Sequence, residues 1–217
     1  MGLKERRQRE KAARKRQILD AARSLLMTEG LPATSIHKIA GAAELGVGTL
    51  YSYFNSKEEI FAALQIEGLE YLYADVLAAV KKEESPSGRL KAIAREYVAF
   101  SRKQKTYFDI INYFLSSPEV FFTPQLKEQV DAYGNRIIDQ ISQTVQTGIT
   151  MGSFQKVDAR RFAIMLWGTL HGLIQFKKLK TTVLKEDNHE ALLESAIEYL
   201  INGLDTQSGT KQPVSIT

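Results

Sequence analysis

The stretch "LGVGTLYSYFNSKEE", from Leu45 to Glu59, is the most informative part of the sequence, because its local signals point to three different structures. Its aliphatic and aromatic side chains favour a β-strand, and "NSKEE" is typical of a helix start. A strand would have no partner, since no other part of the chain alternates as strands do. A phosphate-binding loop built on Gly46-x-Gly48 would lack a third glycine and a preceding strand. A short helix is the interpretation that fits best.

Drawn as a helix over 47–53, this stretch has an inner and an outer side. The inner side is apolar and consists of Val47, Leu50 and Phe54. The outer side is small and carries hydroxyls: Gly48, Thr49 and Ser52, flanked by Tyr51 and Tyr53. Such side chains let a helix come close to DNA in the major groove, and their hydroxyls can bind bases or phosphates. The alternative is a well-packed helical corner in which both tyrosines are half-buried.

The residues before this helix complete a helix-turn-helix pattern. A helix over 35–43, a tight turn over 44–46 and a helix over 47–53 have the spacing of that motif. Thr34 and Ser35 carry the side-chain oxygens that suit an N-cap of the first helix. The pattern therefore favours a DNA-binding unit in the first quarter of the chain.

Positive charge is concentrated at the N-terminus. The first 16 residues hold eight Lys and Arg against two Glu, whereas the whole chain carries a net charge of only +4. One interpretation is a solvated, disordered tail; the other is a nucleic-acid-binding end joined to a neutral body. Lys38 adds a cation to the first motif helix. Lys57 lies in the first turn of the next helix, where backbone N–H groups already favour an anion.

The remainder of the chain is predicted to be helical as well. Apolar stripes at helical spacing, with caps and breakers, predict further helices at 16–29, 56–82, 89–104, 107–116, 124–150, 158–178 and 189–203. The helix that follows the opening stretch begins with Ser56 and Glu59 in the arrangement of a capping box. We therefore expect an all-α protein of about nine helices. The polar segment 206–217 predicts a disordered tail.

Composition excludes several classes of site. The chain has no cysteine, which excludes disulfides and thiolate metal sites. Its three histidines are scattered and no nucleophile has a base beside it, so we expect no metal, no cofactor and no enzymatic activity. The longest apolar run, 162–176, is shorter than a membrane span, and the charged N-terminus is not a secretory signal. We expect a cytoplasmic protein that does not engage a membrane.

The run from Gln17 to Leu64 resembles the DNA-binding domain of the TetR family of bacterial transcriptional regulators. The resemblance rests on "ILDAA", "GLPATSIHKIA" and above all "GTLYSYFNSKEEI". It implies a three-helix DNA-binding domain at 1–58, with the helix-turn-helix at about 35–54, and an effector-binding and dimerisation domain at 59–205. It also implies which residues meet DNA: Thr34 or Ser35, Gly48, Thr49, Tyr51, Ser52, Tyr53 and Lys57. Lys38 joins them on charge alone.

Two residues depart from the family pattern. Glu44 stands where the turn usually has glycine, so we expect it at positive φ, at a cost of about 1 kcal/mol. Val47 stands where many members carry lysine or serine. Its position on the helix is partly inward, so that it can pack against the core or place its methyls against a thymine methyl.

The C-terminal part carries a candidate dimer interface. Gly168 and Gly172 lie one helical turn apart, and glycines at that spacing let two helices approach closely. Together with Leu192, Ala196 and Leu200 they predict a four-helix interface with a second copy of the chain. The alternative is a helix pair within one chain.

The middle of the chain is rich in aromatic residues. The proline-bracketed "SPEVFFTP" is unusual, because its adjacent phenylalanines cannot both fill one helical face. We expect a pocket for an apolar or aromatic ligand, with these candidates: Phe100, Phe108, Phe114, Phe121, Phe122, Tyr133, Trp167 and His171. For His171 a structural, hydrogen-bonded role is the favoured alternative.

Together with the resemblance to the TetR family, the sequence predicts a homodimer that binds double-stranded DNA, most simply a repressor released from a palindromic operator by a small ligand. The alternatives are a transcriptional activator and a less specific nucleic-acid binder without an effector.

Overall fold

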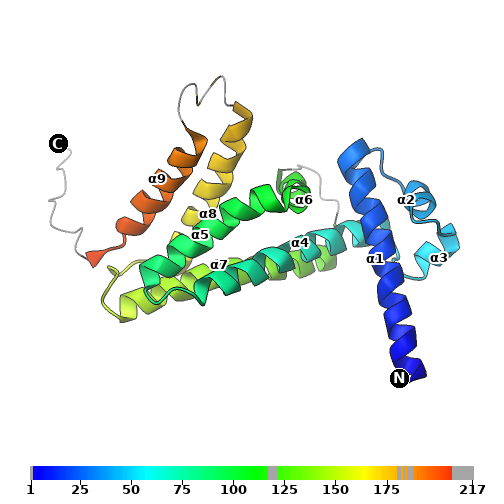
Figure 1. Ribbon diagram of the computed structural model, residues 1–217, viewed down its shortest axis with the longest axis horizontal. Helices are drawn as coiled ribbons and strands as arrows, with labels where there is room; N and C mark the ends of the chain where they lie inside the picture. The colour runs from blue at the N-terminus through cyan, green and yellow to red at the C-terminus, as the bar shows by residue number, and fades with distance from the viewer. Residues whose placement is uncertain (1, 117–121, 180–181, 183, 185–187, 207–217) are drawn as a thin grey trace. The chain divides into compact units, whose positions relative to one another are not determined.

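In the computed structural model the described residues are 2–116, 122–179, 182, 184 and 188–206. They form nine α-helices and one 3₁₀ helix (Figure 1): α1 Leu3–Glu29, α2 Ile36–Ala42, α3 Val47–Tyr51, α4 Lys57–Val80, α5 Pro86–Lys103, α6 Lys105–Ser116, α7 Pro124–Thr150, α8 Ala159–Gln175, η1 Phe176–Leu179 and α9 His189–Asn202. Among these residues the only β pairing is an isolated bridge between Phe154 and Asp205. The predicted all-α class is confirmed. No helix in this part of the chain is both long and apolar enough to cross a membrane.

Several helix ends differ from the predicted boundaries by two or three residues, and the differences at α1 and α3 concern the DNA-binding part of the chain. α1 begins at Leu3 rather than near Arg16, so the basic N-terminal segment is helical and not a disordered tail. Its Arg, Lys, Ala, Glu and Gln residues are good helix formers, and the Glu5 carboxylate accepts a hydrogen bond from the Gly2 N–H at 3.1 Å. α3 ends at Tyr51, because Ser52 is its C-cap. The predicted tail is outside the described residues from 207 onward.

The chain divides into two compact units. The first comprises residues 1–69 and 104–132, and the second comprises residues 70–103 and 133–217. α4 and α7 each have one end in the first unit and the other end in the second. The division expected from sequence, at 1–58, 59–205 and 206–217, stays a prediction about domains.

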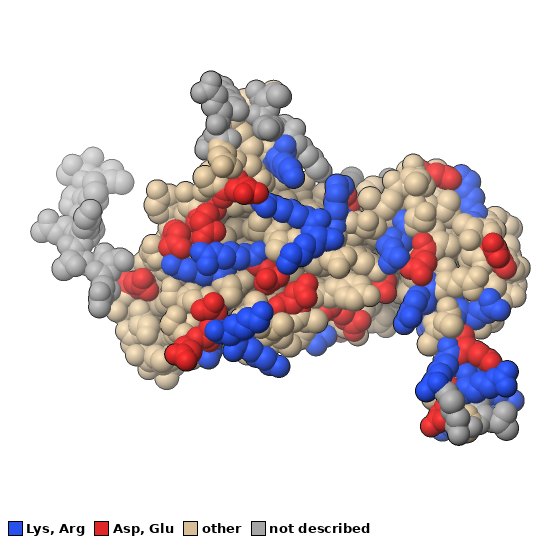
Figure 2. Space-filling view, viewed as in Figure 1, with Lys and Arg blue, Asp and Glu red and all other residues tan. Residues whose placement is uncertain are grey.

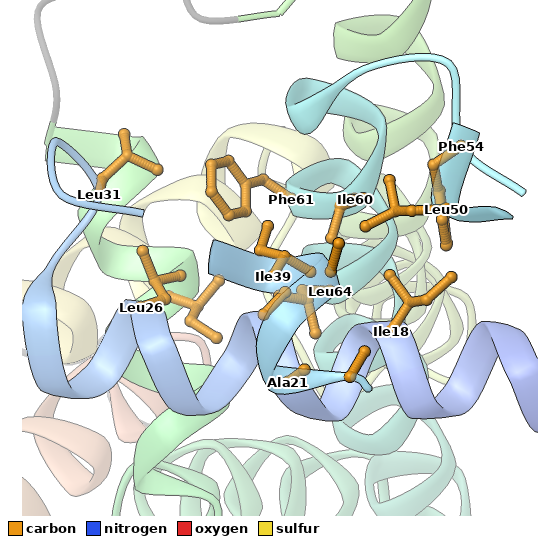
Figure 3. Close-up of a cluster of buried hydrophobic side chains, with 14 residues drawn as sticks. Ile18, Ala21, Leu26, Leu31, Ile39, Leu50, Phe54, Ile60, Phe61 and Leu64 are labelled. Atoms are coloured by element: carbon orange, nitrogen blue, oxygen red, sulfur yellow. The ribbon is translucent and has the colours of Figure 1, made fainter. Parts of the chain in front are cut away.

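The core of the first unit holds α2 and α3 in place. Figure 3 shows Ile18 of α1, Ile39 of α2, Leu50 of α3 and Ile60 and Leu64 of α4 converging on one cluster. All five side chains are fully buried. Every helix of the motif is thereby fixed by an apolar anchor.

The second unit is built around α5, α8 and α9, which pack against one another. Their buried faces carry the apolar stripes, including Phe100, Leu166 and Ile197. Ion pairs run along α5 and α9, among them Lys91 Nζ to Glu198 Oε2 at 2.7 Å and Arg102 to Glu190 at 2.6 Å. The hydrogen bond from Lys91 lowers the pKa of Glu198.

Candidate nucleic-acid interface and effector region

The turn between α2 and α3 has a strained residue at its centre. Ser35 caps α2, its Oγ accepting a hydrogen bond from the Lys38 N–H at 3.3 Å. Glu44 has φ +53°, in the left-handed region that favours glycine. The Leu45 N–H donates to the Ala40 carbonyl at 2.9 Å, which closes the turn. The predicted positive φ of Glu44 is confirmed.

The apolar side of α3 packs against the core of the first unit. Leu50 has no exposed surface, and Phe54, just after the helix, is also buried. Val47 is half-buried and packs against the same core. The predicted inner side of this helix is therefore confirmed, and Val47 faces partly inward as expected.

The opposite side of α3 faces solvent. Gly48, Thr49, Tyr51 and Ser52 are all exposed, Tyr51 by 50%. A Cβ placed on Gly48 would meet nothing within 4 Å, so the backbone there is open to a close approach. The Ser52 Oγ donates to the Thr49 carbonyl at 2.6 Å. This side presents small residues, two hydroxyls and a phenol.

The remaining predicted DNA contacts differ in exposure. Tyr53 is half-buried and packs on the core. Thr34 is 1% exposed, and its Oγ1 donates to the Gly30 carbonyl at 2.7 Å. Of the two candidate caps, Ser35 is thus the one that caps α2 and remains exposed, and the burial of Thr34 argues against a side-chain contact with DNA. Lys38 is exposed beside Glu29, with which it forms an ion pair at 2.5 Å.

The segment after α3 is tied to the start of α4. The Ser56 Oγ accepts from the Glu59 N–H at 3.2 Å, as in the predicted capping box. The Glu59 carboxylate reaches one residue further back than expected, to the N–H and Nδ2 of Asn55, both at 2.8 Å. Lys57, next to this cap, lies with its Nζ 5.9 Å from the Phe61 ring centre.

α6 is joined to α1 and α4 by one tyrosine. The Tyr107 hydroxyl donates to Glu67 Oε2 at 2.8 Å and accepts a hydrogen bond from Arg23 Nη1. The Arg23 guanidinium also lies over the Tyr107 ring, 5.2 Å from its centre. The absence of a side chain at Gly68 allows Tyr107 to pack against α4, because a Cβ on Gly68 would lie 2.9 Å from the Tyr107 Cβ. Sequence reasoning missed this connection, because its members are far apart along the chain.

The candidate pocket residues are divided between the two units. In the first unit Phe114 stacks on Phe122 with ring centres 5.0 Å apart, and lies 6.0 Å from Phe61. Phe108 is buried. Phe121 lies outside the described residues.

A buried amide lies one helical turn from Phe61. Gln65 is 4% exposed, and its Nε2 has no hydrogen-bond partner among the described residues. A buried amide of this kind costs free energy unless something accepts its hydrogen bonds. Nothing in the local sequence pattern distinguishes it from an ordinary surface glutamine.

In the second unit His171 is the centre of a polar and aromatic group. Its Nδ1 shares a hydrogen bond of 2.8 Å with the Tyr97 hydroxyl, and its ring lies 5.5 Å from that of Trp167. Burial lowers the pKa of His171. Burial also raises the pKa of Tyr97, which a hydrogen bond with Trp167 partly offsets. Phe100 is fully buried, and Tyr133 lies beside Arg136, with 5.6 Å between the guanidinium and the ring centre.

One face of α8 is apolar and exposed. Ile164 and Met165 are half exposed, and Gly168 lies on the same side of the helix. A Cβ placed on Gly168 or Gly172 would meet nothing within 4 Å, so no contact among the described residues requires either glycine. On α9, Leu192, Ala196 and Leu200 are partly exposed.

Two family models match this chain. The model of bacterial regulatory proteins of the tetR family matches residues 18–64, which contain all ten predicted DNA contacts. The model of the tetracyclin repressor-like C-terminal domain matches residues 90–200.

Individual relatives match most of the chain. The fatty acid metabolism regulator protein of Bacillus subtilis (strain 168) is 24% identical over 191 residues, which are 87% of this chain and 94% of that protein. The transcriptional activator FasR of Mycolicibacterium smegmatis is 26% identical over 131 residues, 59% of each protein. A crystal structure of the regulator FadR from Bacillus subtilis in complex with stearoyl-CoA has a TM-score of 0.72 at 20% identity, covering 87% of this chain and 98% of that one. The structural likeness shows a shared fold.

Proposed function

This chain belongs to the TetR family of bacterial regulatory proteins and is a DNA-binding transcriptional regulator, and we propose that it is a dimeric repressor which a small, largely apolar or aromatic ligand releases from a palindromic operator. The observation that best supports sequence-specific DNA binding is the composition of the outer side of α3. Its small and hydroxyl-bearing residues are exposed, while Leu50 anchors the helix from below. A helix with this surface can lie close to base edges and phosphates in the major groove.

In this proposal the residues of the motif divide their roles. Thr49 and Tyr51 contact DNA from α3, with Gly48 allowing the approach and Ser52 beside them. Ser35, Lys38 and Lys57 contact phosphates, which fix the position of the protein on the duplex without reading sequence. Tyr53 and Val47 are half-buried, so only the exposed parts of their side chains can contact DNA.

A binding measurement tests this division. We expect Thr49→Val and Tyr51→Phe to weaken binding to a duplex enriched from a random pool, each by about 1–3 kcal/mol if it contacts a base. Tyr71→Phe, at an exposed tyrosine of α4, is the matched control and should leave affinity unchanged. Equal affinity of the wild-type protein for the enriched and a shuffled duplex would instead support a less specific nucleic-acid binder.

Dimerisation is assigned to α8 and α9. The exposed apolar face of α8 and the open space at Gly168 and Gly172 support this assignment, because a second copy could pack closely there. Two copies related by a two-fold axis would present two α3 helices to the two halves of a palindrome. A ligand that favours a dimer with a different separation of its α3 helices would then lower the affinity for the operator.

The effector is proposed to be apolar for most of its length. The stacked Phe114 and Phe122 and the buried amide of Gln65 belong to one unit, and apolar pockets with a few polar groups are typical ligand sites. One relative is named for fatty acid metabolism, and one structural neighbour was crystallised with stearoyl-CoA, so acyl-CoA thioesters are the first compounds to test.

A release assay tests this assignment. Stearoyl-CoA, shorter acyl-CoAs and free fatty acids are titrated into the protein–DNA complex, with unacylated CoA as the control. We expect an acylated compound to release DNA, and Gln65→Leu to raise the concentration required without changing DNA affinity. Loss of DNA affinity in that variant would assign Gln65 a structural role only.

Activation of transcription is the second candidate, because the relative FasR is a transcriptional activator. A reporter gene behind the enriched operator distinguishes the two. Lower expression with the protein present supports repression, and higher expression supports activation.

A further inference from the structure

The first half of α1 is a helix without a packed face. Residues 4–16 are all exposed, and Figure 1 shows this part of α1 projecting beyond α2 and α3 within the first unit. Eight of these thirteen residues are Lys or Arg, and Figure 2 shows their side chains crowding the projecting segment. Like charges one turn apart repel one another, so a bare helix of this composition is destabilised by its own charge. An anionic partner would remove that cost.

Several of these cations have no ion-pair partner in the described part of the chain. Glu5 is engaged at the N-cap, and Glu10 pairs with Arg6 at 2.9 Å. Among the described residues no carboxylate lies within ion-pair distance of Lys4, Arg7 or Lys11.

The cations fall on two sides of the helix. At 100° per residue, Lys4, Arg7, Lys11, Arg14 and Lys15 lie on the same side as Ile18 and Ala22, whereas Arg6, Arg9 and Arg16 lie on the other. Ile18 and Ala22 are buried in the core that also holds α2 and α3. Lys15 confirms the direction, since its Nζ lies over the ring of Phe54 at 5.4 Å from the centre. The first group, called here the near-side cations, thus continues the side of α1 that carries the helix-turn-helix.

We propose that the near-side cations bind the phosphate backbone of duplex DNA flanking the half-site that α3 reads. This inference rests on the proposed function and adds a second contact region to it. Lys4 to Lys15 spans about 16 Å along the helix axis, enough to face several successive phosphates. The segment has no apolar side of its own, which argues against a membrane surface as its partner.

Two charge-matched triple variants test the proposal in the full-length protein. Lys4→Gln, Arg7→Gln and Lys11→Gln together remove three near-side charges. Arg6→Gln, Arg9→Gln and Arg16→Gln together remove three charges from the other side of the same helix. Glutamine is a good helix former, so both variants should keep α1, which circular dichroism checks.

Affinity is measured against salt concentration on an enriched duplex with long flanks, on the same duplex with trimmed flanks, and on an unrelated duplex. We expect the near-side variant to lose about tenfold or more in affinity on long flanks, and the slope of log K against log salt to fall by about two to three. The other variant should change the slope by less than about one. Trimming the flanks should remove the difference between the near-side variant and the wild type.

Equal slopes for the two triple variants, or a near-side variant that binds like the wild type, would overturn the proposal. Its failure is distinct from failure of the proposed function. If only the proposal for the near-side cations fails, the wild type still prefers the enriched duplex. If the proposed function fails, the wild type prefers no duplex. The comparison of the two variants on the unrelated duplex remains a test of the near-side cations in both cases.

Discussion

Single residues carry some of the sharpest packing constraints in the second unit, and Gly148 of α7 is the clearest. A Cβ at this position would lie 2.1 Å from Cδ2 of Phe154, whose ring is buried. Phe154 belongs to the "GSF" segment that follows α7, and its ring fills the space over this glycine. Any side chain at 148 must displace the ring.

We therefore expect Gly148→Ala to lower the free energy of unfolding by about 1–3 kcal/mol, as overpacking of a core does. Gly134→Ala is the matched control on the same helix, because a Cβ there meets nothing within 4 Å. It should raise stability by about 0.5–1 kcal/mol, the usual gain from replacing glycine within a helix. Urea denaturation of both variants gives the comparison. Equal effects of the two substitutions would contradict the packing described for Phe154.

His171 should make stability depend on pH. Its pKa is lowered by burial, so the folded protein holds it neutral where the unfolded chain, with a pKa near 6.5, begins to take up a proton. The contribution of this residue is fully present above about pH 6.5 and is lost as the pH falls below that value. We expect the melting temperature of His171→Gln to fall less between pH 8 and pH 5 than that of the wild type. His37→Gln, at an exposed histidine of α2, should keep the wild-type pH dependence.

At the level of helices, Tyr107 joins α6 to the helices that carry the motif. Tyr107→Phe removes the hydrogen bonds to Glu67 and Arg23 while keeping the ring over Gly68. We expect a loss of about 1–3 kcal/mol in the free energy of unfolding, because two polar partners are left without it. Tyr199→Phe, at a tyrosine that is 79% exposed, should cost less than about 0.5 kcal/mol. A loss no larger for Tyr107 than for Tyr199 would show that the contact does not stabilise α6.

Local sequence patterns predicted the helices and the helix-turn-helix motif well. They did not predict contacts between residues that are far apart along the chain. Leu50, Phe54 and Glu44 were placed correctly, because helical spacing and turn geometry depend on near neighbours. The start of α1 at Leu3 was missed, since a highly charged segment fits a helix and a disordered tail equally well. The partnership of His171 with Tyr97 joins residues 74 positions apart, and no local pattern reports it. Thr34 and Ser35 looked equivalent as caps until the fold buried one of them.

At the level of the whole molecule, assembly can be tested without disturbing the protomer. Gly168 is exposed and a Cβ there meets nothing within 4 Å among the described residues, so we expect the Gly168→Leu protomer to fold normally. If a second copy packs against this face, the same side chain keeps the helices apart. We expect sedimentation to show a dimer for the wild type and a monomer for Gly168→Leu. Gln146→Leu, at an exposed position of α7, is the control and should remain dimeric. A dimeric Gly168→Leu variant would place the interface elsewhere.

In the proposed dimer, two copies of α3 read the two halves of one operator. Selection of bound duplexes from a random pool by the wild-type protein tests it most directly. We expect enrichment of an inverted repeat whose half-site centres lie one or more helical turns of DNA apart. Recovery of unrelated sequences, or of a single site without symmetry, would contradict it.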